Sequence, residues 1–270
     1  MRTRAGLIGD PVSHSLSPRI FKAVSARLGR KVSYEAFRVR PMELECVLRK
    51  LKAEGFSGLN VTIPHKVAAA RHLSSLTSEA RLIGAVNAVR FSRASSRGHN
   101  TDAAGFADAL RETGFEMAGK DAVVFGTGGA ARAVGLALAS LKARRVRFTG
   151  RSPARARTVA RLLRRTRART RFEAGGSRSA ALWVNATPLG MKGFPDKAPF
   201  KGRARCELAF DLVYGRRTAF LKKAAASGAQ AVGGMSMLVY QALRSWEFWF
   251  KPLGAARRRD LKNDIIKRIQ

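Results

Sequence analysis

A short apolar stretch that runs directly into a glycine-rich turn is the feature that most constrains the fold of this chain. Residues Asp121–Phe125 have the composition of a buried strand, and an Ala/Leu-rich helical pattern extends to about Leu141. Between them stands Gly126-Thr127-Gly128-Gly129-Ala130-Ala131, which fits the pattern G-x-G-x-x-A. The first glycine permits a tight turn, the second lets the backbone approach a ligand, and the alanine allows close packing of helix on strand. The pattern predicts a Rossmann-type domain in which the helix N-terminus binds the diphosphate of a dinucleotide.

The end of the next predicted strand indicates which dinucleotide to expect. A site for NAD usually offers Asp or Glu there, to hold the ribose 2′-hydroxyl. Here strand Arg145–Thr149 leads into Gly150-Arg151-Ser152-Pro153-Ala154-Arg155, which contains no acidic residue. Guanidinium groups chelate the 2′-phosphate that a carboxylate would repel. We therefore expect NADP as the cofactor; the alternative is that Arg151 and Arg155 are simply two more arginines in an arginine-rich chain.

Strand-like and helical segments alternate along the whole chain, which is typical of an α/β fold with parallel sheets and crossover helices. A length of 270 residues allows two domains. We place a boundary near Asp102–Ala104, where a helix could join them, and expect the helical stretch from Met237 to fold back on the first domain. The strands predicted outside the glycine-rich unit are Ala5–Gly9, Val32–Arg38, Gly58–Val61, Leu182–Asn185 and Leu208–Leu212.

The composition limits the cellular setting and the partners. Lys and Arg total 52 against 18 acidic residues, giving a net charge of +34. Such a balance suggests nucleic acid or an anionic surface, but the basic residues are spread along the chain without interleaved aromatic residues, so we interpret them as a solvated surface. No segment resembles a signal peptide or a membrane span. Cys46 and Cys206 form neither a disulfide framework nor a ligand spacing, so we expect a cytoplasmic protein without a metal.

Polar clusters follow the predicted strands of the first hundred residues. Ligands of open α/β sheets bind outside the carboxyl ends of strands, so we expect these clusters to form one site. Hydroxyls, amides, one lysine and one aspartate suit a small polyhydroxylated acid. The clusters are Ser13-His14-Ser15-Leu16-Ser17-Pro18, Asn60-Val61-Thr62-Ile63-Pro64-His65-Lys66, Gly84-Ala85-Val86-Asn87 and Asn100-Thr101-Asp102.

Three further motifs complete a resemblance: Asn185-Ala186-Thr187-Pro188-Leu189-Gly190, Asp211-Leu212-Val213-Tyr214 and Met237-Leu238-Val239-Tyr240-Gln241-Ala242. With them, the chain resembles the shikimate dehydrogenase family over nearly its whole length. The resemblance implies NADPH-dependent reversible reduction of 3-dehydroshikimate to shikimate, on the route to chorismate and the aromatic amino acids. It also implies two α/β domains flanking a cleft, with residues 1–102 and 237–270 binding the substrate and residues 103–236 binding NADP. The expected assembly is a monomer or a homodimer, with no membrane or nucleic acid as partner.

The resemblance also implies roles for individual residues. Lys66 and Asp102 match the catalytic pair: the lysine would protonate the oxygen on which negative charge develops, and the carboxylate would favour its ammonium form. Asp102 could instead serve only as the cap of the following helix. The implied substrate-binding residues are Ser15, Ser17, Asn60, Thr62, Lys66, Asn87, Asp102, Tyr214 and Gln241. The implied cofactor-binding residues are Gly126, Thr127, Gly128, Gly129, Ala130, Ala131, Gly150, Arg151, Ser152, Arg155, Leu212 and Gly234.

Some positions depart from the common pattern of the family, and two other functions remain open. Ser78 stands where many relatives carry an acid, while Gly150 and Gly233 replace a frequent Asn and Asp, which bears on cofactor affinity. One rival is a quinate/shikimate dehydrogenase using NAD; Ser17 argues against it, because quinate-preferring relatives often have Thr there. The other is a nucleic-acid-binding protein on a dehydrogenase scaffold, which only the net charge supports.

Overall fold

The computed structural model describes residues 3–166, 168–176 and 179–269. The chain divides into two compact units. Unit 1 comprises Met1–Thr101 with Val239–Gln270, and unit 2 comprises Asp102–Leu238. Each unit contains a six-stranded sheet covered by helices, so the α/β class expected from the alternating pattern is confirmed.

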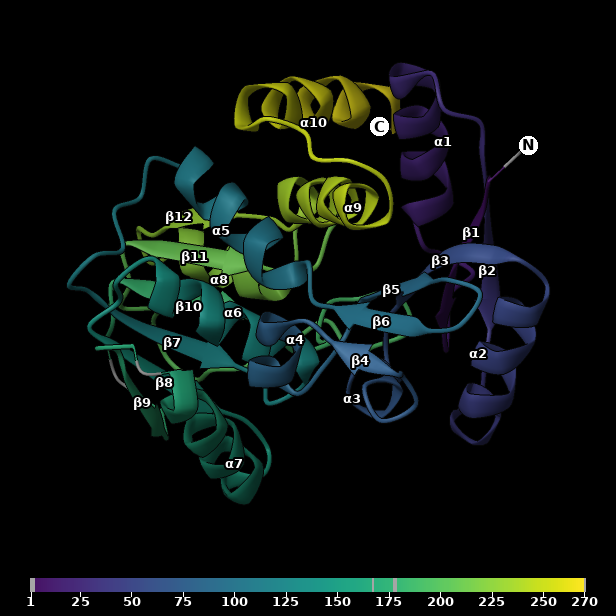
Figure 1. Ribbon diagram of the computed structural model, residues 1–270. Helices are drawn as coiled ribbons and strands as arrows, with labels where there is room; N and C mark the ends of the chain where they lie inside the picture. The colour runs from purple at the N-terminus through teal and green to yellow at the C-terminus, as the bar shows by residue number, and fades with distance from the viewer. Residues whose placement is uncertain (1–2, 167, 177–178, 270) are drawn as a thin grey trace. The chain divides into compact units, whose positions relative to one another are not determined.

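The sheet of unit 1 has the strand order β2-β1-β3-β5-β6-β4 (Figure 1). Strand β1 pairs in parallel with both β2 and β3, whereas β5 is antiparallel to β3 and to β6. The bounds are β1 Thr3–Gly9, β2 Val32–Arg38, β3 Phe56–Val61, β4 Ser75–Leu76, β5 Ala88–Phe91 and β6 Ser96–His99.

The prediction of a parallel sheet is therefore wrong for this edge of unit 1. Residues 92–95 alone connect β5 to β6, and a loop of that length can join antiparallel strands but not parallel ones. The Ser92 and Ser95 hydroxyls bond to each other across this loop at 2.8 Å. The hairpin has a useful consequence: the start of β5 and the end of β6 both lie beside the carboxyl end of β3.

Helices from both ends of the sequence cover the unit 1 sheet. Trp249 at the end of α9 donates its indole N–H to the Val89 carbonyl oxygen of β5 at 2.9 Å, and its ring packs directly over Gly58 of β3. Helix α10 packs against α1 (Figure 1). The bounds of these helices are α1 Ser17–Leu28, 3₁₀ helix η1 Pro41–Glu43, α2 Leu44–Ala53, α3 Lys66–Ala69, α4 Ser78–Ile83, α9 Met235–Trp249 and α10 Ala255–Ile269.

Unit 2 has a fully parallel sheet with the order β12-β11-β10-β7-β8-β9 (Figure 1). The strands are short and largely buried, as expected for a sheet covered on both faces. The strand bounds are β7 Asp121–Phe125, β8 Arg145–Thr149, β9 Arg171–Ala174, β10 Leu182–Asn185, β11 Leu208–Asp211 and β12 Gln230–Val232. The helix bounds are α5 Asp102–Glu112, α6 Gly129–Ser140, α7 Pro153–Leu163, 3₁₀ helix η2 Arg164–Thr166 and α8 Ala219–Ala225.

Helix length bears on the question of a membrane span. Across the part of the chain that the structure describes, none of the helices combines the length and the apolar character needed to cross a bilayer.

Candidate functional site

The polar residues predicted in unit 1 gather at one edge of its sheet because of the strand directions. Thr62 directly follows β3, and its N–H bonds to the Ile8 carbonyl oxygen of β1 at 2.9 Å. Asn87 precedes β5 and Thr101 follows β6, and the antiparallel hairpin brings both to the carboxyl end of β3. A hydrogen bond of 2.9 Å from the Val61 N–H to the Asn87 carbonyl oxygen closes this edge.

Tyr34 of β2 joins two of the predicted substrate residues. Its hydroxyl donates to Oδ1 of Asn60 at 2.9 Å, and the Ser17 side chain hydrogen-bonds to it. Burial raises the pKa of Tyr34 well above 10, with the Ser17 bond acting in the opposite direction, so the hydroxyl keeps its proton and remains a donor. The ring stacks on Phe21 at a centroid distance of 4.2 Å. Ser15 also belongs to this group, because its Oγ accepts from the Ser17 N–H at 3.2 Å.

A buried hydrogen-bond network connects the two predicted asparagines with helix α9. Nδ2 of Asn60 donates to the Asn87 carbonyl oxygen at 3.0 Å and to Oγ of Ser245 at 2.8 Å. Oδ1 of Asn87 accepts from the Thr101 N–H at 2.7 Å, and Nδ2 of Asn87 donates to Oε1 of Gln241 at 3.3 Å. Ser245 and Thr101 are fully buried, and their hydroxyls lie 3.1 Å apart. The predicted residues Asn60, Asn87 and Gln241 therefore lie together.

The two predicted catalytic residues belong to different units. Lys66 is the first residue of α3 and is half-buried, and its carbonyl oxygen accepts from the Val86 N–H at 2.8 Å. Asp102 is the buried first residue of α5. Each has a defined place in the backbone of its own unit, and their pairing stays a prediction.

In unit 2 the glycine-rich turn has the local geometry that its sequence predicts. Gly126 has φ +126°, and a Cβ there would come within 2.7 Å of the Ala186 carbonyl oxygen, so only glycine fits without strain. Gly128 precedes α6 in an extended conformation, and a Cβ there would meet nothing within 4 Å. Ala131 is fully buried. The start of α6 is therefore exposed at Gly128, and the first N–H groups of a helix have no partner within the helix, which suits a diphosphate.

The arginine-containing loop lies next to that turn. The Gly126 N–H bonds to the Thr149 carbonyl oxygen at 2.8 Å, and a Cβ on Gly150 would lie 3.4 Å from the Thr127 side chain. Ser152 caps α7 by accepting from the Arg155 N–H at 3.3 Å. Arg151 and Arg155 are both exposed. Two guanidinium groups are therefore available beside the glycine-rich turn.

The remaining predicted residues of unit 2 follow the next strands along the same edge. The Leu212 N–H bonds to the Asn185 carbonyl oxygen at 3.0 Å. A Cβ on Gly234 would come closer to the Leu212 carbonyl oxygen than any van der Waals contact allows, so this position requires glycine. Tyr214 is half-buried in the same loop. Unit 2 thus holds Tyr214, whereas the other predicted substrate residues, Asp102 excepted, lie in unit 1.

Asp211, at the end of β11, organises this edge. Its carboxylate accepts from Nδ2 of Asn185 at 2.9 Å, from the Val213 N–H at 3.0 Å and from the Thr218 hydroxyl at 2.5 Å. Burial raises the pKa of Asp211 to about 6, and these hydrogen bonds partly offset the effect. Asn185 in turn accepts from the N–H and the hydroxyl of Thr187. The network fixes the loops after β10 and β11.

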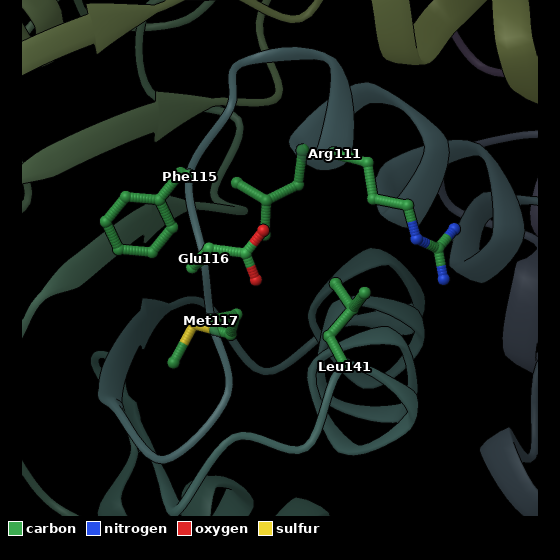
Figure 2. A pocket seen from close by; sticks show the side chains of 6 residues that line it. Arg111, Phe115, Glu116, Met117 and Leu141 are labelled. Carbon is green, nitrogen blue, oxygen red and sulfur yellow. The ribbon is translucent and has the colours of Figure 1, made fainter.

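A small pocket lies elsewhere in unit 2, at the opposite edge of the sheet. It is lined by Leu110, Arg111, Phe115, Glu116, Met117 and Leu141 (Figure 2). These residues precede β7 and β8, whereas the glycine-rich turn follows β7. Figure 2 shows the Arg111 guanidinium pointing away from Glu116, and Arg111 instead pairs with Asp108 at 3.4 Å. The pocket is therefore separate from the predicted site, and the described residues contain no cluster of three or more metal-ligating side chains.

The sequence pattern does not single out Tyr34, Ser245 or Asp211 as supports of the site. Ser245 could have been found because it lies four residues after Gln241 on one helix face. Asp211 stands in one of the family motifs, but its burial could not be derived from the pattern alone. Tyr34 gives no signal, since an aromatic residue in a strand is ordinary.

Comparisons with known proteins all lead to the same family. A family model described as the shikimate dehydrogenase substrate binding domain matches residues 7–89. The shikimate dehydrogenase (NADP(+)) of Symbiobacterium thermophilum is 39% identical over 259 residues, covering 91% of this chain and 88% of that protein. The protein of the same name from Methanopyrus kandleri is 42% identical over 257 residues, covering 90% and 89%.

Solved structures give the same result. The shikimate 5-dehydrogenase of Thermus thermophilus, solved in complex with NADP(H) and shikimate, matches with a TM-score of 0.81 and 33% identity. The match covers 97% of this chain and 99% of that one. With relatives above 30% identity over nine tenths of its length, the chain belongs to the shikimate dehydrogenase family.

Proposed function

We propose that this protein is an NADP-dependent shikimate dehydrogenase, which reversibly reduces 3-dehydroshikimate to shikimate in the pathway to chorismate. The observation that carries the proposal is the similarity, over at least nine tenths of the chain, to relatives named for that activity. The protein is accordingly an oxidoreductase that uses NADP.

The residues of unit 2 fit the cofactor. The exposed start of α6 would receive the diphosphate, since a Cβ at Gly128 meets nothing within 4 Å. Arg151 and Arg155 would hold the 2′-phosphate, with no acidic side chain in Gly150–Arg155 to repel it. Leu212 and Gly234, on neighbouring loops of the same edge, would line the remainder of the site.

The polar residues of unit 1 would bind and orient the substrate. Ser15 and Ser17 would bind its carboxylate. Ring hydroxyls would be held by Asn60, Thr62, Asn87 and Gln241, and Tyr214 would contact the substrate from unit 2. Such preformed partners fix the ring in one orientation, which is how a site discriminates among hydroxyls.

The proton chemistry would belong to Lys66 and Asp102. The chemistry supplied by the bound dinucleotide is a hydride for the carbonyl carbon. As negative charge develops on the carbonyl oxygen, the Lys66 ammonium would donate a proton to it and stabilise the charge before transfer. The Asp102 carboxylate would favour the ammonium form of the lysine. In the reverse direction the neutral lysine would accept the hydroxyl proton.

The first test is the initial rate of NADP or NAD reduction with shikimate and, separately, with quinate. Turnover confined to shikimate and NADP is the expected result. Comparable rates with quinate or NAD would instead place the protein with the quinate/shikimate dehydrogenases. Absence of turnover with all four pairs would contradict the proposal, and salt-sensitive DNA binding by that inactive protein would favour the nucleic-acid alternative.

A further inference from the structure

Asn60 has a nearly complete set of hydrogen bonds inside unit 1. Its Nδ2 donates both hydrogens, one to the Asn87 carbonyl oxygen at 3.0 Å and one to Oγ of Ser245 at 2.8 Å. Its Oδ1 accepts one hydrogen, from the Tyr34 hydroxyl at 2.9 Å. A side-chain amide has two donor hydrogens and two acceptor lone pairs. The capacity that Asn60 has left for a ligand is therefore one lone pair on Oδ1.

The orientation of this amide is determined by its partners. A main-chain carbonyl oxygen can only accept, so the atom facing the Asn87 carbonyl must be the nitrogen. A protonated tyrosine hydroxyl donates to the opposite atom, which must be the oxygen. Ser245 takes the second amide hydrogen, so neither hydrogen of this amide is left for a ligand.

The Ser245 hydroxyl bonds both to its own helix and to the side chain of Asn60. It donates to the Gln241 carbonyl oxygen one turn earlier at 3.0 Å, a bond that the helix does not need. With its hydrogen used there, its oxygen serves as an acceptor for Asn60 Nδ2 and lies 3.1 Å from Oγ1 of Thr101. A fully buried hydroxyl costs free energy unless it is bonded in this way.

We propose that Ser245 is a positioning residue for the substrate: it occupies the second amide hydrogen of Asn60, so that Asn60 can only accept a hydrogen bond from a ring hydroxyl. The inference rests on the proposed function and adds a specificity rule to it. A ligand must present an O–H group to Asn60, and a carbonyl or ether oxygen at that point would leave two acceptors facing each other.

Ser245→Ala removes the hydroxyl and leaves a helix-favouring residue at a buried position. We expect the KM for shikimate to rise about five- to tenfold, as for the loss of one hydrogen-bond partner, because Asn60 then regains a free donor and keeps only two of the three hydrogen bonds that orient its side chain. We expect kcat to change less than about twofold, since Ser245 acts only through Asn60, and the KM for NADP to stay unchanged.

Ser96→Ala is the matched control. Ser96 is a buried serine of unit 1 whose Oγ accepts from the Ser74 N–H at 3.0 Å. The Ser96→Ala variant should have the wild-type KM for shikimate. Shikimate analogues that lack the 4- or the 5-hydroxyl add a second readout. One of these analogues lacks the hydroxyl that would donate a hydrogen bond to Asn60. For that analogue, the wild type and Ser245→Ala should have similar KM values.

The outcomes separate the two proposals. A wild-type protein that does not turn over shikimate would contradict the proposed function itself. An active wild type with an unchanged KM in Ser245→Ala, or an equal rise in the KM for NADP or in Ser96→Ala, would overturn the positioning role alone. If Ser245→Ala does not fold, Ser245→Cys decides the matter: sulfur is a weak acceptor, so an unchanged KM for shikimate would overturn the role and a raised one would support it.

Discussion

Several single side chains of this protein serve local structure and the site at once. Ser152 caps α7 while standing in the predicted cofactor loop, and Thr218 caps α8 while bonding to Asp211. Substituting either would change stability and function together. Lys66 and Arg151 are not the N-cap residues of their helices, so substituting them tests the proposed roles without removing a helix cap.

Lys66→Ala tests the proposed proton donor. We expect kcat to fall roughly 10²–10⁴-fold, the usual contribution of a positioned acid, with a modest change in KM. Lys22→Ala, which removes an exposed lysine of α1, is the control and should retain wild-type rates. A large rise in KM at unchanged kcat would show that Lys66 only binds the substrate.

Arg151→Ala tests the arginines of the loop after β8. The loss of a charge-assisted hydrogen bond to a 2′-phosphate should weaken NADPH roughly 10–100-fold and leave NADH nearly unaffected. Dissociation constants from fluorescence titration give both values. Arg161→Ala, an exposed arginine further along α7, serves as the control. Equal losses for both cofactors would contradict the assignment.

At the level of elements, the glycine-rich unit could be predicted from sequence because local and long-range requirements coincide there. Strands β7, β8 and β10 have the predicted bounds, since short apolar runs next to turn residues have few alternatives. The sequence does not indicate strands β5 and β6, because Ala88–Phe91 and Ser96–His99 lack a repeating pattern and depend on cross-strand partners. The residues around Asn60 were predicted from family motifs, whereas the bonds from Tyr34 and Ser245 depend on packing between distant segments.

Two glycines of the same turn should respond differently to alanine. Gly126→Ala places a Cβ at φ +126° within 2.7 Å of the Ala186 carbonyl oxygen, so we expect a loss of about 1–3 kcal/mol in unfolding free energy. Gly128→Ala adds a Cβ into open space and should leave stability nearly unchanged while weakening NADP binding. Urea unfolding and cofactor titration of both variants separate the effects. Unimpaired NADP binding in Gly128→Ala would argue against a diphosphate at this turn.

The raised pKa of Asp211, which holds the loops after β10 and β11, predicts that the free energy of unfolding depends on pH. Burial raises its pKa to about 6 from 3.8, so the folded protein holds this proton more tightly than the unfolded chain. The resulting stabilisation is complete below about pH 4 and is lost as the pH rises through about 6. A shift of about two units corresponds to about 3 kcal/mol.

Asp211→Asn should remove this dependence. Urea unfolding between about pH 4 and pH 7 should show the difference in free energy between wild type and variant changing by about 3 kcal/mol, to the disadvantage of the wild type at the higher pH. Asp260→Asn, at an exposed position, should follow the wild type. Parallel curves for wild type and Asp211→Asn would contradict the raised pKa.

At the scale of the whole molecule, the proposed reaction does not by itself require a net charge of +34. No acidic residue occurs from Ala122 to Phe172, a range that contains the glycine-rich turn and all of α7. The exposed arginines of this range include Arg151, Arg155, Arg157 and Arg161. Substrate and cofactor are both anions, so a field of this sign would raise the frequency of productive encounters.

The association rate of NADP should therefore fall with added salt. Between about 20 mM and about 500 mM KCl we expect a decrease of about tenfold or more in the rate measured by stopped-flow fluorescence, because screening shortens the reach of the field to a few ångströms. The dissociation rate should change much less. An association rate independent of ionic strength would mean that the arginines do not attract the cofactor from a distance.

Unit 1 is built from two segments of the chain that are separated by the whole of unit 2, which affects the order in which the units can fold during translation. Trp249, which covers Gly58, and Ser245, which bonds to Asn60, leave the ribosome only after the whole of unit 2. Unit 2 is a continuous segment and can complete its core while translation continues. Unit 1 is thus completed only after unit 2 has been synthesised, and its segment before unit 2 stays partly uncovered until helices α9 and α10 have been made.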